Sequence, residues 1–202
     1  EIYTLSLHDA LPIWLDAEMI ASGGERFVAP LRPLFERADL VIGNLETPLC
    51  DREAPIPKCG PNFISPPALA PVLQRLGFDC LCLANNHVND QDVQGLEQTL
   101  QTLDAIGMPR CGAGMTHEEA CRPAVLTARG RRVAVFAFGE GEFAQCQENG
   151  PGVARVEPFW PERRVMQARE QYDIVLVVLH VGNEYQPIPS QVTADFCRRM
   201  AA

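Results

Sequence analysis

The run DCLCLANNH at residues 79–87 indicates the fold class, because a short apolar run ends there in a cluster of polar residues. Three further runs follow the same pattern: DLVIGNLE at 39–46, VAVFAFGEGE at 133–142 and DIVLVVLHVGNE at 173–184. Short runs of Val, Ile and Leu that are apolar on both faces are typical of strands buried inside a parallel sheet. The sequence therefore predicts an α/β fold with a mainly parallel sheet.

Polar side chains follow each of these runs. In open α/β sheets the ligand lies beyond the carboxyl ends of the strands, so we expect these side chains to face one crevice. They are acids, amides and imidazoles: Asn44, Glu46, Asn85, Asn86, His87, Glu140, Glu142, His180 and Glu184. Such groups pack poorly in a core but are good ligands for a divalent metal. The sequence therefore predicts a metal site at this edge.

Length and charge limit the possible functions. A chain of 202 residues with 47% hydrophobic content is long enough for one substantial core, and we expect one domain. Its formal net charge of −9 argues against a nucleic-acid partner, because phosphate neutralisation needs clustered Lys and Arg. An excess of carboxylates suits bound cations, which could in turn hold an anionic substrate. No apolar stretch approaches the ~20 residues that span a bilayer.

The eight cysteines contain no C-x-x-C pair with zinc-ligand spacing. Reduced thiols in a cytoplasmic protein are our first interpretation, with Cys80 and Cys82 as small buried apolar groups. A bridge between Cys50 and Cys59 and a structural zinc site are the alternatives. A membrane-associated or extracytoplasmic location is the alternative if an anchor precedes the chain.

The chain divides into a leader and one domain. Residues 1–13, EIYTLSLHDALPI, join poorly to the residues after them, and we interpret them as a non-native leader. Residues 14–202 form the single predicted domain. The chain stops inside or just after a helix, where a βα series would normally return to another strand. We therefore expect the domain to be truncated at its C-terminus.

Several local elements are predicted from periodicity and caps. They are a helix over 27–37, a helix from Pro67 to Gly77, a helix over 92–106 with Val93, Leu96, Leu100 and Leu103 inward, a capping box at Thr116 and Glu119, a hairpin of 124–128 with 133–138, a helix over 161–171 and a helix from Ser190. Asp39, Asp79 and Asp173 begin strands, so we expect them to be structural.

The strand-end residues can each be interpreted in two ways. Asn86 offers a neutral oxygen ligand and His87 can donate a proton, although Asn-Asn is also ordinary turn chemistry beside a surface histidine. His180 ends the most apolar strand, so it is either a hydrogen-bonded core histidine or a ligand. Glu46 directly follows its strand, where a solvated loop carboxylate is the alternative. Two histidines and Glu46 at equivalent strand ends favour a metal site.

Lys58 is the only lysine in the chain, and it lies in the Pro-rich segment PIPKCGPNF. It could reach an anionic substrate as a point charge, or be solvated like most loop lysines. His8 and His117 are expected to have no function.

Five motifs together resemble the poly-gamma-glutamate capsule synthesis (CapA-like) family. They are GNLETPL at 43–49, FISPP at 63–67, GFDCLCLANNHVND at 77–90, GAG at 112–114 with the following Glu119-Ala120, and HVGNEY at 180–185. They occur in the family's order and cover roughly residues 17–202. The family is similar to the calcineurin-like metallophosphoesterases, which implies a sandwich of two sheets flanked by helices with a two-metal site at the strand ends.

The resemblance also implies roles for single residues. Glu46 would lie near or bridge two metal ions, and Asn86 and His180 would be ligands. His87 would be the acid that protonates the leaving oxygen. The supporting residues would be Asn44, Asn85, Asp90 and Glu184. Asp9, in the leader, is the one acid near the family's first Gly-Asp motif, and the family's late Gly-His-x-His motif has no counterpart in this chain.

The implied cofactors are two divalent ions, with Mn, Fe, Zn and Mg not distinguished by mixed oxygen and nitrogen ligands. Such ions clamp a phosphoryl group from positions ~3.5–4 Å apart. The predicted function is a capsule or poly-gamma-glutamate biosynthesis protein with a metal-dependent phosphoesterase-like site. Its partners would be an anionic phosphate-containing or polyglutamate-type ligand and capsule synthesis machinery at the membrane. The alternatives are a non-catalytic polymer assembly or binding component on the same fold and part of a (β/α)-barrel hydrolase.

Overall fold

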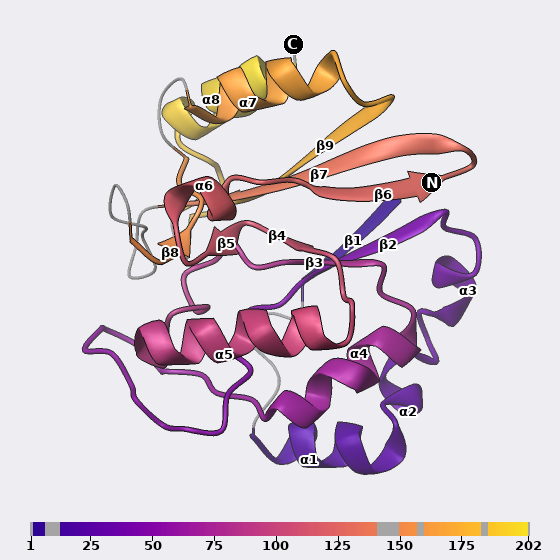
Figure 1. Cartoon of the computed structure of the whole chain (residues 1–202), viewed down its shortest axis with the longest axis vertical. Helices are drawn as coiled ribbons and strands as arrows, with labels where there is room; N and C mark the ends of the chain where they lie inside the picture. The colour runs from indigo at the N-terminus through magenta and orange to yellow at the C-terminus, as the bar shows by residue number, and fades with distance from the viewer. Residues whose placement is uncertain (1, 7–12, 141–149, 157–159, 183–185, 202) are drawn as a thin grey trace.

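The computed structural model describes residues 2–6, 13–140, 150–156, 160–182 and 186–201 (Figure 1). Its first sheet has four parallel strands in the order β1-β2-β3-β4. These strands are β1 (Ile2–Ser6), β2 (Leu40–Asn44), β3 (Cys80–Cys82) and β4 (Arg110–Cys111). Strand β1 comes from the segment interpreted as a leader, and it pairs along its whole length with β2.

A second sheet has the order β6-β7-β9. Its strands are β6 (Ala124–Ala128), β7 (Arg131–Gly139) and β9 (Ile174–His180). Strands β6 and β7 form the predicted hairpin, whose two-residue turn has φ of 48° at Arg129 and 73° at Gly130. Positive φ at both turn residues matches the twist of an antiparallel pair. Strand β9 joins β7 in parallel, and β5 (Ala113–Gly114) pairs separately with β8 (Gly152–Val153).

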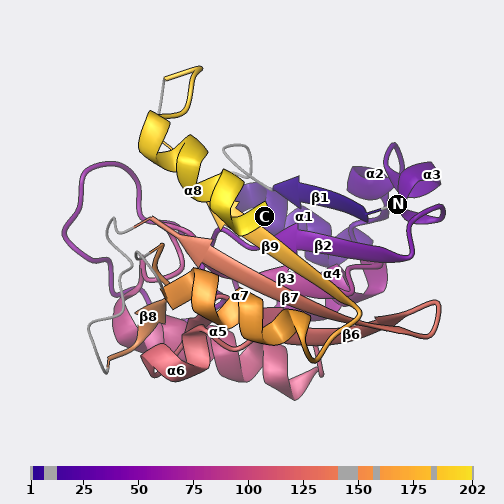
Figure 2. The same cartoon turned by 90° about the horizontal axis from the view of Figure 1, so that it is seen from above.

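Helices cover the outer faces of the two sheets (Figures 1 and 2). Those beside the first sheet are α1 (Ile13–Ser22), α2 (Glu25–Val28), α3 (Arg32–Phe35), η1 (Pro67–Leu69), α4 (Ala70–Leu76) and α5 (Asp92–Ala105). Those beside the second are α7 (Trp160–Arg169) and α8 (Gln191–Ala201), and α6 (His117–Ala120) is short. The α/β class is confirmed. The sheets of the described residues are separate, so the barrel alternative is wrong.

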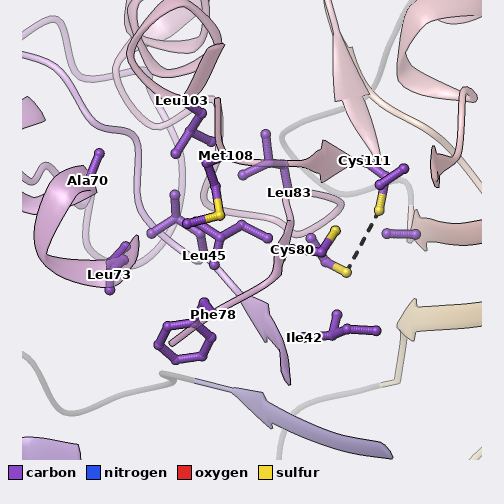
Figure 3. Packing of buried hydrophobic residues seen from close by; sticks show 14 of the residues in the cluster. Ile42, Leu45, Ala70, Leu73, Phe78, Cys80, Leu83, Leu103, Met108 and Cys111 are labelled. Atoms are coloured by element: carbon purple, nitrogen blue, oxygen red, sulfur yellow. Dashed lines mark hydrogen bonds between the residues drawn. The ribbon is translucent and has the colours of Figure 1, made fainter. Parts of the chain in front are cut away.

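Strand β7 explains why the two sheets form one body. Its residues alternate between two cores, because successive side chains of a strand point to opposite faces. Val133, Val135 and Ala137 pack with the first sheet and its helices. Ala134, Phe136 and Phe138 pack on the other side, in the cluster that contains Val165 and Ala168 of α7. Figure 3 shows part of the first core, in which Leu45, Phe78, Leu83 and Met108 lie together.

Most predicted element ends are confirmed, and two predictions need correction. Gly77 ends α4 with φ of 101°, and Thr116 Oγ1 accepts a hydrogen bond from the Glu119 N–H at 3.1 Å. The helix predicted over 27–37 is instead two short helices, because Pro30 interrupts it. Val93 is 38% exposed, because it lies in the first turn of α5 and the buried face of that helix begins at Gly95.

The three aspartates that begin strands have structural partners, as expected. Asp79 Oδ2 accepts a hydrogen bond from the Val41 N–H at 2.7 Å. Asp173 Oδ2 accepts one from the Arg132 N–H at 2.8 Å, and Asp39 Oδ1 accepts one from Arg129 Nε at 2.7 Å. These carboxylates therefore connect neighbouring segments at the amino ends of the strands, away from the polar crevice.

The described cysteines are free thiols. Cys80, Cys82 and Cys111 are buried, and the sulfurs of Cys82 and Cys111 lie 3.8 Å apart on paired positions of β3 and β4. The prediction that Cys80 and Cys82 are buried groups is confirmed. Within the part of the chain that the structure describes, no helix combines the length and apolarity needed to cross a membrane.

Candidate functional site

Most of the predicted site residues that the structure describes lie where the carboxyl ends of both sheets converge. Glycine at position 139, the last residue of β7, makes this approach possible. A Cβ atom at Gly139 would lie 3.2 Å from the carbonyl carbon and oxygen of Ala84, which is tighter than nine in ten real Cβ contacts. The end of the second sheet therefore packs directly against the turn that begins at Asn85.

Asn44 and Asn85 build the floor of the site. Asn44 Nδ2 donates to Glu46 Oε2 at 2.8 Å, and Asn85 Nδ2 donates to Asn44 Oδ1 at 3.1 Å and to the Leu45 carbonyl at 2.9 Å. The Asn85 amide oxygen accepts from the N–H groups of His87 and Val88. Asn85 thus uses both ends of its amide to shape the turn, and it orients the residues on either side.

Glu46, Asn86 and His180 come together from three strand ends. His180 Nε2 lies 3.1 Å from Asn86 Oδ1 and 3.7 Å from Glu46 Oε1. The Glu46 side chain is only 2% exposed, whereas that of His180 is 32% exposed. This small group therefore has one buried carboxylate and one imidazole that solvent can reach.

These three side chains carry donor atoms of the kinds that a divalent ion binds, and two of their separations are known. Two donors that share an ion at about 2.1 Å lie roughly 3.0–3.5 Å apart, close to the separations of Nε2 from the two oxygens. Among the described residues, no three His, Cys, Asp or Glu side chains are grouped to hold a metal. A site here therefore needs the neutral Asn86 oxygen as its third donor.

His87 lies in a second group of side chains around Asp90. His87 Nδ1 is 2.7 Å from Asp90 Oδ2, and the Phe63 N–H donates to the same oxygen at 2.6 Å. Lys58 forms an ion pair with Asp90 Oδ1, and its Nζ lies 3.1 Å from His87 Nδ1. The Phe63 ring stacks on the imidazole, with centroids 4.1 Å apart at 19°. The side chains of Lys58 and Asp90 are 2% and 0% exposed.

The structure brings most of the predicted site residues into these two adjoining groups. They are Asn44, Glu46, Asn85, Asn86, His87, Asp90 and His180, with Lys58 beside them. Glu140 donates its N–H to the His180 carbonyl at 3.0 Å. Asp9, Glu142 and Glu184 lie outside the described residues. His117 begins α6, its Nε2 lies 3.6 Å from the sulfur of Cys121 just after that helix, and it belongs to neither group.

Phe63 is the site residue that the sequence patterns did not reveal. The FISPP motif contains it, but an aromatic residue before a turn is usually part of the core. Its contact with His87 joins positions 24 residues apart, and no periodicity spans that distance.

Comparison with known proteins gives a consistent family. Residues 6–202 match the model of the family described as "Bacterial capsule synthesis protein PGA_cap". The chain is similar to "PGA biosynthesis protein CapA" of Bacillus subtilis, with 26% identity over 190 residues, which are 89% of this chain and 48% of the relative. It is also similar to "Capsule biosynthesis protein CapA" of Bacillus anthracis, with 26% identity over 167 residues, covering 78% and 41% of the two chains.

A third relative is the "Probable polyglutamine synthesis accessory protein" of Mycobacterium tuberculosis, which is 27% identical over 183 residues. These residues are 80% of this chain and 46% of that protein. The chain thus spans about half the length of the curated relatives it matches.

Proposed function

The chain belongs to the bacterial capsule synthesis family of CapA-like proteins, and on this premise we propose that it serves capsule or poly-gamma-glutamate biosynthesis through a metal-dependent phosphoesterase-like site. The observation that carries the proposal is the convergence of Glu46, Asn86 and His180 from three strand ends. Two sheets with helices on their outer faces are also what a calcineurin-like phosphoesterase would need. Its site would lie at the strand ends.

Glu46 Oε1, Asn86 Oδ1 and His180 Nε2 would hold one divalent ion, and Asp9 would contribute to a second. Mn, Fe, Zn and Mg all accept this mixture of oxygen and nitrogen donors. When bound, such ions polarise a phosphoryl oxygen and lower the pKa of a coordinated water.

The chain's own residues would perform the remaining tasks. Glu46 is almost fully buried, so its charge would attract a cation more strongly than the charge of an exposed carboxylate would. His87 lies next to Asn86 in the chain, and its Nδ1 is engaged by Asp90. Its Nε2 is therefore the nitrogen that would take up a proton and pass it to the leaving oxygen. The ligand would be an anionic phosphate-containing or polyglutamate-type molecule, handled with capsule synthesis machinery at the membrane.

A second candidate is a non-catalytic polymer assembly or binding component. It is favoured by the word "accessory" in the name of the Mycobacterium tuberculosis relative. The partly exposed amide of Asn86 also suits hydrogen bonding to a polymer backbone, whereas Asn44 and Asn85 are buried and bonded within the site.

Metal content and turnover distinguish the two candidates. We would load the chain with Mn or Zn, remove free metal, and measure bound metal by elemental analysis and hydrolysis of a chromogenic phosphodiester. The same measurements would be made on His180→Ala and on the matched control His117→Ala. We expect the parent and the control to hold metal and to hydrolyse the ester, and His180→Ala to lose both while staying folded. A parent that binds no metal would contradict the phosphoesterase and favour the binding component.

A further inference from the structure

Lys58 reaches the site from a loop that contacts Asp90 and His87, here named the Lys58 loop (residues 51–65). Asp90 holds this loop at three residues: it pairs with Lys58, accepts the Phe63 N–H on Oδ2, and accepts the Ile56 N–H on its carbonyl at 3.1 Å. We propose that Lys58 is a positioning residue. Its ammonium group is one of three groups that donate to the Asp90 carboxylate, and by holding this carboxylate in place it sets the tautomer and ring orientation of His87. The proposal rests on the phosphoesterase-like function proposed above.

Three donors converge on the buried Asp90 carboxylate. Lys58 serves Oδ1, and the Phe63 N–H and His87 Nδ1 serve Oδ2 at 2.6 and 2.7 Å. His87 Nδ1 has two polar neighbours, Asp90 Oδ2 at 2.7 Å and Lys58 Nζ at 3.1 Å. An ionised carboxylate only accepts hydrogen bonds, so we assign the proton on Nδ1 to the shorter contact with Oδ2, and Lys58 directs its hydrogens to Oδ1. This geometry assigns neutral His87 the tautomer protonated at Nδ1, which leaves Nε2 as an acceptor.

The Lys58 charge is needed because the carboxylate is fully buried. A buried carboxylate without a counter-charge destabilises the folded state. It avoids this cost by taking up a proton or by moving toward water. Either change would alter its bond to His87 Nδ1. With Lys58 in place the carboxylate keeps a counter-charge, and the stacked Phe63 ring limits rotation of the imidazole.

This role differs from direct contact with an anionic substrate. Only 2% of the Lys58 side chain is exposed, and its charge is balanced by Asp90. A substrate contact mainly changes KM when it is removed, whereas a group that positions the proton-transfer residue mainly changes kcat.

The test compares the parent with Lys58→Met, in the chain labelled with ¹⁵N-histidine. In the parent we expect ring ¹⁵N signals of the Nδ1-protonated tautomer for His87. In Lys58→Met we expect the two ring signals of His87 to move toward each other as both tautomers become populated. For phosphodiester hydrolysis we expect kcat to fall at least about tenfold while KM stays within about twofold.

Arg52→Met is the matched control, because Arg52 is an exposed cation of the same loop that donates to Gln94. It should leave the His87 signals and the kinetics unchanged. Lys58→Gln keeps a hydrogen-bond donor without the charge, and it replaces Lys58→Met if the latter does not fold; the same shift is expected. Unchanged His87 signals in either folded variant would overturn the proposal, as would a rise in KM alone.

The two proposals can fail separately. If the parent hydrolyses no ester but the His87 signals still move in Lys58→Met, the positioning role stands and the phosphoesterase fails. If the parent is active and the His87 signals do not respond, the positioning role fails and the phosphoesterase stands.

Discussion

His87 follows β3 of the first sheet and His180 ends β9 of the second sheet, and the two histidines are held by different kinds of contact. The partners of His87 all come from the first half of the chain, and they surround a carboxylate that solvent cannot reach. His180 belongs to the second sheet, and its partners Asn86 and Glu46 belong to the first. Its side chain is also much more exposed, at 32% against 9% for His87.

The difference teaches how one site can combine a fixed group with an adjustable one. His87 is surrounded by a local network that changes only if the Lys58 loop changes. His180 depends on how the two sheets pack, since its contact with Asn86 spans 94 residues. Perturbing Asp90 should therefore affect His87 first, and perturbing the contact between the sheets should affect His180 first.

The largest effect is expected from Asp90→Ala. The substitution leaves Lys58 as a buried charge without its carboxylate, and breaking a buried pair in this way costs about 3–5 kcal/mol. Urea unfolding would measure the loss of stability. Asp195→Ala is the control, because Asp195 pairs with Arg198 on the surface and should matter by less than about 1 kcal/mol. Equal losses of stability for the two variants would show that the buried Asp90 pair contributes no more than a surface ion pair.

The next largest effect is expected from Gly112→Ala, which acts between the sheets. Gly112 has φ of 93°, and an added Cβ would lie 2.7 Å from Ala84 Cβ and 2.8 Å from Ala137 Cβ. Overpacking and backbone strain together should cost about 2–4 kcal/mol. Urea unfolding would measure that cost. The ring ¹⁵N signals of His180 should change more than those of His87.

Gly130→Ala separates strain from packing for that prediction. Gly130 also has positive φ, at 73°, but nothing lies within 4 Å of an added Cβ. It should cost about 1 kcal/mol and leave both histidines unchanged. If Gly130→Ala costs as much as Gly112→Ala, crowding between the sheets is not the cause.

A smaller effect is expected from Phe63→Leu. The change removes the ring that stacks on His87, and such ring pairs contribute about 0.5–1.5 kcal/mol beyond the area they bury. Thermal unfolding would record the loss, and NMR would record faster motion of the His87 ring. Phe63→Tyr keeps the stacked ring and should behave like the parent. No response of His87 to the leucine variant would mean that Asp90 alone orients the imidazole.

The smallest effect is expected from Asp16→Asn, a buried carboxylate without a cation in its described contacts. Burial raises the pKa of Asp16, and a hydrogen bond from Ser65 lowers it to a lesser extent. A carboxyl whose folded-state pKa is raised binds its proton more tightly when folded. The parent therefore loses stability as pH rises from the pKa of Asp16 in the unfolded chain to its higher pKa in the folded protein. The asparagine variant should gain no more than about 1 kcal/mol at pH 7 and nothing well below pH 3.8. Denaturant unfolding at both pH values would measure it, and a gain that persists at low pH would contradict the assignment.

Much of the fold could be predicted because it depends on local pattern. The apolar run from Val133 to Phe138 predicts a strand that is buried on both faces, and the structure divides those residues between two cores. Gly77 predicts the end of a helix because only glycine readily adopts the φ found there. Val93 was wrongly predicted to be buried. Its spacing matches the buried residues of α5, but it lies in the first turn, which extends beyond the packed face of that helix.

The chain's own sequence determined the strands β2, β3, β7 and β9, their polar ends and the kinds of donor at those ends, because these depend on residues that are close together in the chain. It did not reveal β1, whose residues were interpreted as a leader. Tertiary structure alone decided which donors meet. Lys58 is paired with Asp90, 32 residues away, and Asn86 is paired with His180, 94 residues away. Such pairs depend on sheet order and on how closely the sheets approach, as at Gly139 against Ala84. Periodicity carries no information about distances of that kind, because it describes only the neighbours of each residue along its own helix or strand.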